Sequence, residues 1–352
     1  MEHFAGLDVA TKETVISVVD AAGETVLETS VLSDPEAIAE TLAPYVKTLR
    51  RVGHEAGSLA PWLQKGLLER GVPAVCLETI AVRAALKAQR NKTDVTDARG
   101  IAQMMRTGWF RAVHMKSDES YRLRFLLSQR RNLKRKFLDL ENAIRHSLKA
   151  FGIKLSAVSR GRFEEVVREK IACDPMLSEL ADAMLNARAA LWVEYKRLHN
   201  LLVRITAADP VCSRFMAIPG VGPVTALTFK TAVDDPARFS RSRDVGAHFG
   251  LTPARYQSGE SVDRHGGVSK RGDKEVRTAL YEAASGMLVR SQKWCALRAW
   301  GLKISKRSGH KKAVTALARR LAVTMLAMWR DGSEFRWGHA PDGEDAADQA
   351  AR

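Results

Sequence analysis

The stretch Phe4-Ala5-Gly6-Leu7-Asp8-Val9-Ala10 is an apolar run that a single charge interrupts. Such a run is typical of a buried strand, and a charged residue is rarely buried without a partner. Two more runs of strand-forming residues follow, 14–19 and 26–32, with a turn near Gly23 between them. The sequence therefore predicts an antiparallel meander of three strands that carries Asp8 on its first strand.

Helices and short strands alternate after the meander. Their apolar spacing predicts a helix over 35–49, a strand over 52–56, a helix over 61–70, a strand over 74–77 and a helix over 80–90. The strand over 52–56 carries one acid near its end, Glu55, in a context similar to that of Asp8. We therefore expect an α/β domain with acids on two of its strands.

A pair of carboxylates, Asp94 and Asp97, opens the next predicted helix between the cations Lys92 and Arg99. Residues three apart share a helix face, and two carboxylates held together repel one another unless a cation lies between them. A hard divalent ion, Mg²⁺ or Mn²⁺, suits such oxygen ligands. The alternative is that both acids only favour the positive end of the helix dipole.

Asp8, Glu55, Asp94 and Asp97 together form a set of four acids on this pattern of strands and helices. Here the chain resembles the ribonuclease-H-like nucleases of the Holliday-junction-resolvase (RuvC-like) type. The resemblance implies a catalytic domain over 1–113 in which the four acids converge on two Mg²⁺ ions, and paired ions of this kind assist phosphoryl transfer. The alternative is four unrelated surface acids.

The composition limits the class of protein. With 352 residues, 45% hydrophobic and 27% charged, the chain is long enough for two folded domains. Its formal net charge of +16 predicts a polyanionic partner, most simply nucleic acid. We find no apolar stretch of membrane-spanning length and no signal-peptide pattern, and therefore expect a cytoplasmic, nucleoid-associated bacterial protein without a membrane partner.

Two long helices are predicted in the region 114–210, because residues that are apolar apart from Arg130 recur there at heptad spacing. The two series are Leu126, Arg130, Leu133, Phe137, Leu140, Ile144 and Phe151, then Met184, Leu191, Tyr195, Leu198, Leu202 and Ile205. Such spacing predicts a helical hairpin or coiled coil, formed within one chain or between protomers. The first helix also carries a basic ridge, which we define as Arg130, Arg131, Lys134, Arg135 and Lys136. We expect the ridge to contact phosphates; a solvated helix face is the alternative.

The region 211–332 is predicted to be mainly α-helical. It contains Ile218-Pro219-Gly220-Val221-Gly222-Pro223, which resembles a helix-hairpin-helix turn. In such a turn Gly220 and Gly222 would let the backbone approach a phosphate, whereas a plain interhelical turn would not bind one. Residues 333–352 are predicted to form a disordered tail.

A basic loop is predicted over 249–261, with Ser258 beside a glycine. From residue 264 to residue 330, sixteen Lys and Arg stand against three acids, so this part of the chain is expected to face phosphates. The candidate nucleic-acid contacts here are Arg255, Lys270 and Arg271, and Lys92 is a further candidate in the N-terminal domain.

Ordered motifs from residue 4 to residue 330 make the whole chain resemble one family. They are Gly6-Leu7-Asp8, His54-Glu55-Ala56-Gly57, Arg90 to Asp94, Asp97-Ala98-Arg99, Ile218 to Gly222, Gly250 to Pro253, Tyr256 to Gly259 and Ser269 to Asp273. The family is that of the bridge-RNA-guided insertion-sequence transposases, which join a RuvC-like DEDD domain to a C-terminal serine transposase domain. Where many members read Glu-Ala-Thr-Gly, this chain reads Glu55-Ala56-Gly57-Ser58, which indicates a different subgroup.

The resemblance implies the chemistry. Ser258 would be the nucleophile, and Asp8, Glu55, Asp94 and Asp97 would bind the metal. The serine and the four acids of one site would come from different protomers of a homodimer that assembles to a tetramer. A noncoding guide (bridge) RNA would pair with donor and target DNA, so that base pairing selects the sequence.

The predicted function is therefore RNA-guided cutting and rejoining of DNA through a 5′-phosphoserine intermediate. A serine hydroxyl is a weak nucleophile that needs a base or a metal, and no obvious base adjoins Ser258. One alternative is a metal-dependent Holliday-junction-type endonuclease without a serine-linked intermediate. Another is a noncatalytic nucleic-acid scaffold.

Overall fold

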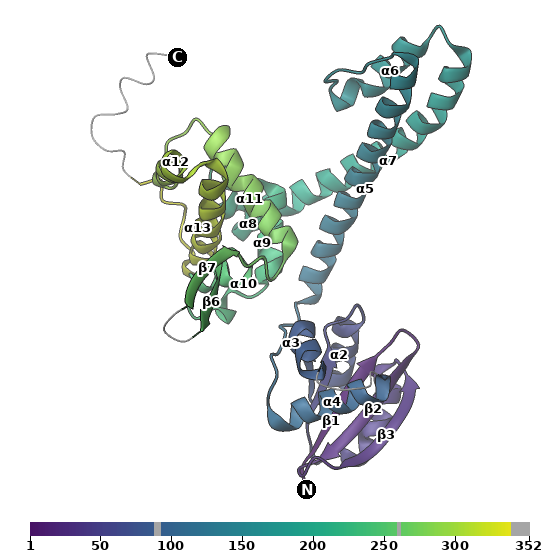
Figure 1. Cartoon of the computed structure of the whole chain (residues 1–352), viewed down its shortest axis with the longest axis vertical. Helices are drawn as coiled ribbons and strands as arrows, with labels where there is room; N and C mark the ends of the chain where they lie inside the picture. The colour runs from purple at the N-terminus through teal and green to yellow at the C-terminus, as the bar shows by residue number, and fades with distance from the viewer. Residues whose placement is uncertain (88–92, 259–261, 339–352) are drawn as a thin grey trace. The chain divides into compact units, whose positions relative to one another are not determined.

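The computed structural model describes residues 1–87, 93–258 and 262–338, so the candidate Lys92 lies outside the described residues. The chain divides into two compact units, unit 1 over 1–116 and unit 2 over 117–352 (Figure 1). None of the described helices combines the length and apolar character needed to cross a membrane.

Unit 1 contains a five-stranded sheet with the order β3-β2-β1-β4-β5. Its strands are β1 (His3–Val9), β2 (Glu13–Asp20), β3 (Thr25–Leu32), β4 (Leu49–Glu55) and β5 (Ala74–Leu77). The first three strands form an antiparallel meander, and β4 and β5 run parallel to β1. This ribonuclease-H-like topology confirms the fold class predicted for the N-terminal domain.

Helices cover both faces of the sheet, because successive side chains of a strand point to opposite faces. Ala5 and Leu7 of β1 pack in one core with α1 (Pro35–Leu42) and α2 (Ala60–Glu69). Phe4 packs in a second core with α3 (Thr79–Leu86) and α4 (Asp94–Thr107). Asp8 follows Phe4 by four residues on the same strand, so its side chain lies on the same face of the sheet, which α4 covers.

The helix predicted over 35–49 is shorter than expected. It ends at Leu42, a 3₁₀ turn follows over Ala43–Tyr45, and Leu49 already begins β4. Pro44 has no backbone N–H with which to continue the α-helical hydrogen bonds, which accounts for the early end. The helix predicted over 80–90 ends as α3 at Leu86, and residues 88–90 lie outside the described part of the chain.

Unit 2 begins with the predicted helical hairpin, made of α5 (Asp118–Leu148) and α7 (Pro175–Ala208) with the short α6 (Phe163–Ile171) between them. The helices are antiparallel: Arg130 contacts Tyr195, whereas Glu141, further along α5, contacts Arg188, earlier in α7. The pairing is thus formed within the chain.

Two details of the hairpin differ from the heptad prediction. Phe151 is 60% exposed, because α5 ends at Leu148 and the chain turns at Gly152, whose φ is +74°. The side chains of Glu141 and Arg188, each 3% exposed, form an ion pair that is buried inside the hairpin. Heptad spacing predicts only apolar contacts there.

The rest of unit 2 is mainly helical, as predicted, and is built on one large core. Its helices are α8 (Pro210–Met216), α9 (Pro223–Val233), α10 (Asp244–His248), α11 (Lys274–Val289), α12 (Ala296–Ser308) and α13 (His310–Asp331). Residues 333–338, assigned from the sequence to a disordered tail, pack on this core: Phe335 is buried, and the Trp337 carbonyl accepts a hydrogen bond of 2.8 Å from the Ala296 N–H. Residues 339–352 lie outside the described chain.

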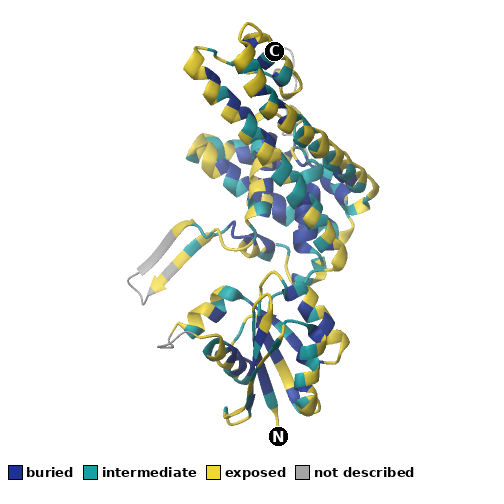
Figure 2. Ribbon diagram, turned by 90° about the vertical axis from the view of Figure 1, so that its right-hand side faces the viewer, coloured by how far each residue is buried: buried dark blue, intermediate teal, exposed yellow. Residues whose placement is uncertain are grey.

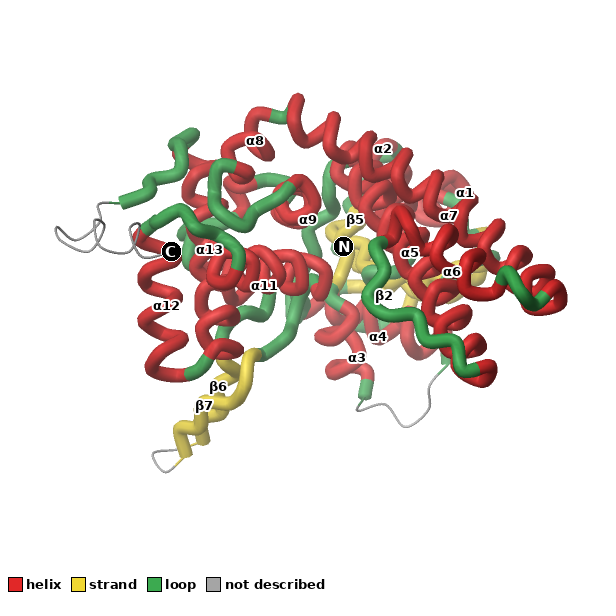
Figure 3. The backbone as a smooth tube through the Cα atoms, turned by 90° about the horizontal axis from the view of Figure 1, so that it is seen from above, coloured by secondary structure: helices red, strands yellow, loops and turns green. Residues whose placement is uncertain are grey.

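The loop predicted over 249–261 is instead largely a strand. β6 (Pro253–Ser258) pairs antiparallel with β7 (Val262–Val268), and the two form a hairpin that stands away from the helices of unit 2 (Figures 2 and 3). A two-stranded ribbon can form without burying one of its faces, so its sequence need not alternate between apolar and polar residues. The glycines and charges of this segment therefore predict a loop.

Candidate functional site

Two glycines allow α4 to lie directly on the sheet. Gly6 of β1 and Gly53 of β4 are register partners. A Cβ atom at Gly6 would lie 2.1 Å from the Ala98 carbonyl oxygen of α4, and one at Gly53 would lie 2.8 Å from the Ile101 side chain. Only glycine at both positions permits this close approach.

The same geometry determines which face of the sheet carries the acids. Asp8 and Glu55 each stand two residues after one of the glycines, and a strand repeats its facing every two residues. Both therefore share the sheet face that α4 covers, at the end where Asp94 and Asp97 begin α4. The repeated pattern of glycine, one residue, then acid is a sequence signal that could have located this face.

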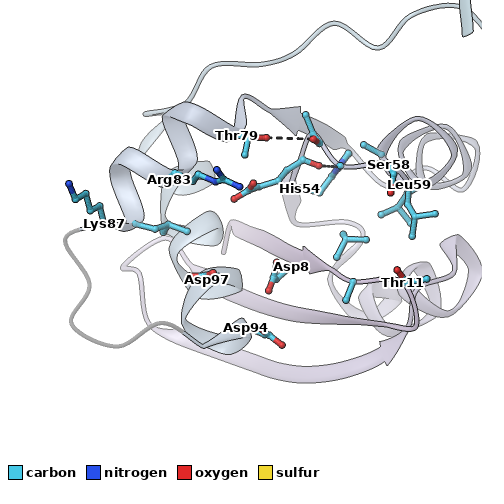
Figure 4. A pocket seen from close by; sticks show the side chains of 18 residues that line it. Asp8, Thr11, His54, Ser58, Leu59, Thr79, Arg83, Lys87, Asp94 and Asp97 are labelled. Carbon is cyan, nitrogen blue, oxygen red and sulfur yellow. Dashed lines mark hydrogen bonds between the residues drawn. The ribbon is translucent and has the colours of Figure 1, made fainter. Parts of the chain in front are cut away.

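All four predicted acids line one cavity of about 760 Å³. We call it the carboxylate cavity; Figure 4 shows Asp8, Asp94 and Asp97 gathered at one side of it. Asp8, Glu55 and Asp97 are half-buried, and Asp94 is exposed. The structure thus brings together four residues that are up to 89 positions apart in the sequence, from Asp8 to Asp97.

Neither Asp94 nor Asp97 caps the N-terminus of α4. Thr93 is the N-cap, and its hydroxyl accepts a hydrogen bond of 3.2 Å from the Thr96 N–H. The Thr96 hydroxyl in turn accepts one of 2.9 Å from the Thr93 N–H, which completes a capping box. Asp94 and Asp97 are therefore not needed to cap the helix.

Carboxylate oxygens are the ligands that Mg²⁺ and Mn²⁺ prefer, so the chemistry of the donor set fits a divalent ion. As placed within residues 1–87, 93–258 and 262–338, no three His, Cys, Asp or Glu side chains form a group close enough to hold a metal ion. Carboxylates that share a site repel one another, and a divalent cation among them offsets that repulsion.

Two cations missed by the sequence analysis also line the carboxylate cavity. Arg83 and Lys87 lie one turn apart at the end of α3, and both are exposed (Figure 4). Their spacing of four residues on a basic helix is the signal that could have found them. Positive side chains beside a cluster of acids suit a substrate that carries phosphates.

Arg99, one of the cations flanking the acid pair, points elsewhere. Its Nε and Nη2 donate hydrogen bonds of 2.8 and 3.0 Å to the two carboxylate oxygens of Glu28 on β3. These bonds hold the pKa of Glu28 below its ordinary value. Arg99 therefore fastens α4 to the sheet edge.

His54 supports the strand that carries Glu55. It is fully buried, with Nε2 3.2 Å from the Gln64 Oε1 and Nδ1 3.2 Å from the Glu55 carbonyl oxygen. Burial lowers the pKa of His54 despite both hydrogen bonds. The ring thus ties the end of β4 to α2.

The basic ridge of α5 divides into two groups. Arg130 donates hydrogen bonds of 3.1 Å from Nε to His199 Nδ1 and of 2.9 Å from Nη2 to the Tyr195 hydroxyl. Arg131 forms an ion pair with Glu275, with 2.5 Å between Nη1 and Oε2. Both arginines thus have partners inside unit 2. Lys134, Arg135 and Lys136 are exposed and remain the stronger candidates for phosphate contact.

The glycines of the predicted helix-hairpin-helix turn differ from each other. Gly220 has a φ of +84°, and a Cβ there would lie 2.4 Å from the Ala283 carbonyl oxygen of α11, so packing alone requires a glycine. Gly222 is the N-cap of α9, and a Cβ there would meet no atom within 4 Å. Of the two, Gly222 has the room that a bound phosphate would need.

The remaining candidates lie on or beside the β6–β7 hairpin. Ser258 is the last residue of β6, and its backbone is in register with Val262; its side chain lies outside what the structure describes. Arg255 is exposed on the same strand. Lys270 and Arg271 are exposed where β7 leads to α11, and a Cβ at Gly250 would lie 1.9 Å from the Arg271 carbonyl oxygen. The turn at Gly250 thus packs closely against the backbone that follows β7.

Comparison with known proteins gives matches over most of the chain. Residues 212–299 match a family model described as the transposase IS116/IS110/IS902 family, and residues 5–153 match a DEDD-type transposase model of the IS110 group. The chain is 30% identical over 298 residues to a putative transposase (y4pF/y4sB) of Sinorhizobium fredii, covering 83% of this chain and 71% of that protein.

Two further similarities are more distant. A transposase for insertion sequence element IS1111A of Coxiella burnetii is 28% identical over 76% of this chain and 74% of its own length. The solved structure of Thermus thermophilus RuvC matches 32% of this chain and 99% of that chain, at 17% identity and a TM-score of 0.25.

Proposed function

This chain belongs to the IS116/IS110/IS902 family of insertion-sequence transposases, and from that premise we propose that it cuts and rejoins DNA through a phosphoserine link at Ser258. Membership of the family supports an enzyme that acts on DNA, and a DEDD nuclease domain implies a divalent metal, typically Mg²⁺. The serine chemistry, the guide RNA and the oligomer are parts of the proposal.

The observation that carries the proposal is the convergence of Asp8, Glu55, Asp94 and Asp97 on one cavity. When bound there, a divalent ion supplies a positive charge that activates an attacking oxygen and stabilises a leaving one. The four acids hold that charge. Arg83 and Lys87 bind the phosphates of the strand that enters the cavity and set its position.

Ser258 supplies the nucleophile. Its Oγ attacks the scissile phosphorus, the bond to the 3′-oxygen breaks, and that oxygen leaves as a hydroxyl after taking up a proton. The serine hydroxyl proton passes to solvent, and the phosphate stays on the serine as an ester of the 5′ end. Because one phosphoester replaces another, the reverse reaction can join a new 3′-hydroxyl without an external energy source.

The position of Ser258 supports this role. It ends β6, on a hairpin that stands clear of the helical core (Figure 3). A reactive group on such a hairpin can reach a DNA strand without displacing the core. Arg255, Lys270 and Arg271 add positive charge around the same hairpin.

We further propose that a noncoding guide (bridge) RNA pairs with donor and target DNA, and that the protein acts as a homodimer assembling to a tetramer. The net charge of +16, with exposed cations in both units, supports a partner with more phosphates than one cleavage site requires. Such a protein would work in the bacterial cytoplasm at the nucleoid.

The test is to trap the covalent intermediate. The protein, its copurified RNA and DNA carrying the ends of its element are mixed with Mg²⁺ and quenched in denaturant, and the DNA-linked peptide is mapped. Wild-type protein should give an adduct at Ser258, and Ser258→Ala should give neither adduct nor cleavage. Ser261→Ala and Ser269→Ala are the matched controls and should retain the adduct. Free 3′-hydroxyl and 5′-phosphate ends without any adduct would support the metal-dependent endonuclease instead.

A further inference from the structure

A second hollow, of about 750 Å³, lies in unit 2 at the base of the β6–β7 hairpin. We call it the hairpin hollow. One wall comes from the hairpin itself, at Pro253 and residues 266–268, and the others come from α12 at Trp300 and from α13. Neither the nucleophile nor any of the four acids belongs to it.

Four cations of α13 line the hairpin hollow: Lys311, Lys312, Arg319 and Arg320. All four are exposed, and among the described residues that line the hollow none is acidic. The opposite face of α13 is buried in the core of unit 2, so the cations lie on its outer face. This concentration of one charge predicts an anionic ligand.

Apolar side chains also line the hollow, and we call them its floor: Leu251, Pro253, Val268 and Val323. The Arg320 guanidinium lies 4.6 Å from the centre of the Trp300 ring. A guanidinium plane and an aromatic ring are the surfaces on which proteins stack unpaired bases. An apolar floor inside a cationic rim therefore suits a ligand with a flat base and a phosphate.

We propose that the hairpin hollow binds an unpaired nucleotide of the DNA strand on which the hairpin acts. The base packs against the floor, and the flanking phosphates contact the lysines and arginines of the rim. The volume lies within the range of pockets for small ligands, and a paired base inside a duplex has no free face to insert. The choice of DNA rests on the function proposed above.

The hollow is distinct from the place where Ser258 reacts. Pro253 at the hollow and Ser258 are separated by five residues of extended strand, or about 16 Å at roughly 3.3 Å per residue. A nucleotide held at the base of the hairpin thus fixes the strand a short way from the scissile phosphate. Binding there also fixes the hairpin against α13.

The experiment measures binding without chemistry, in the Ser258→Ala background and without metal. The probes are three fluorescein-labelled 12-mers: single-stranded DNA, the matching DNA duplex and single-stranded RNA. Ala316→Phe fills the floor of the hollow without changing charge. It should weaken binding of single-stranded DNA by about tenfold, the scale of losing one stacked base, and leave duplex binding within twofold.

A second variant tests the hollow in case Ala316→Phe does not fold. Lys311→Gln with Lys312→Gln removes two rim charges from the surface and should lower the salt slope for single-stranded DNA by about 1.4. The matched control is Lys303→Gln with Lys306→Gln on α12, two exposed lysines outside the hollow. Photocrosslinking of a DNA 12-mer with one 5-iodouracil should label peptides that contain Trp300 or Val323.

With Ala316→Phe, equal losses for duplex and single-stranded DNA, or a larger loss for the RNA than for the single-stranded DNA, would overturn the proposal. Crosslinks confined to α5 would overturn it as well. The result is independent of the serine chemistry. A missing Ser258 adduct in the trapping experiment would remove the proposed function but would leave a binding preference for single-stranded DNA unchanged.

Discussion

Gly6 and Gly53 lie side by side on neighbouring parallel strands, and the space above them is filled by the backbone and side chains of α4. The pair therefore determines how close the helix that begins with Asp94 comes to the strand that carries Asp8. Any side chain at either glycine must push that helix away from the sheet.

Gly6→Ala should destabilise unit 1 and abolish DNA cleavage, because the new Cβ would lie 2.1 Å from the Ala98 carbonyl oxygen. Overpacking of this kind costs about 1–3 kcal/mol. Thermal unfolding followed by circular dichroism measures the loss. Gly57→Ala is the control for stability, since a Cβ there meets no atom within 4 Å. Equal melting temperatures for the two variants would show that α4 does not need the glycine.

Arg83→Gln with Lys87→Gln should weaken DNA binding and raise the KM for cleavage, because two cations leave the wall of the carboxylate cavity. The salt slope of duplex binding should fall by about 1.8, at roughly 0.9 per phosphate contact. Lys47→Gln changes an exposed lysine of unit 1 outside the cavity and should leave the slope unchanged. A slope equal to wild type in the double variant would mean that these cations do not meet phosphates.

Lys134, Arg135 and Lys136 of the basic ridge should behave differently from Arg130, which has partners inside unit 2. Neutralising Lys134, Arg135 and Lys136 together should reduce the salt slope by roughly 0.7–0.9 for each phosphate that the ridge no longer neutralises, with no change in melting temperature. Arg130→Gln should instead lower the melting temperature, because Arg130 bonds to Tyr195 and His199 inside the hairpin. An unaltered slope in the triple variant would make the exposed ridge a solvated helix face.

The stability of unit 1 should fall in acid through His54. Burial lowers the pKa of this ring in the folded state, so the unfolded chain binds the proton more readily. The contribution of His54 to the free energy of unfolding is fully present above the unfolded-state pKa of about 6.5 and is lost as the pH falls below that value. His54→Gln should reduce the difference between melting temperatures at pH 7.5 and pH 5.5. A difference equal to that of wild type would assign the acid sensitivity to other groups.

The local features of unit 1 can be predicted from the sequence. Alternation and turn residues locate the meander, and the pattern of acids on strands and helix is enough to select Asp8, Glu55, Asp94 and Asp97. The cavity itself depends on the register that pairs Gly6 with Gly53 across 47 residues of chain, and no local pattern contains that register.

Other features are hidden in the sequence for physical reasons of their own. Arg83 and Lys87 look like a solvated helix face until α3 is placed beside the acids. Glu141 and Arg188 are charges that heptad spacing treats as exposed, yet they bury each other. Where burial is described in the β6–β7 hairpin, no residue is buried, so its sequence shows no apolar alternation and its strands look like a loop.

The most direct test of the carboxylate cavity is Mg²⁺-dependent cleavage by Asp94→Asn and Asp97→Asn, each compared with Asp139→Asn, which changes an exposed acid of α5. Removing one metal-binding charge should abolish cleavage in both cavity variants while nucleic-acid affinity stays near that of wild type, and Asp139→Asn should cleave normally. Addition of Mg²⁺ should raise the melting temperature of wild type and of Asp139→Asn more than that of the cavity variants. Full cleavage by both cavity variants would contradict the assignment of a metal to these acids.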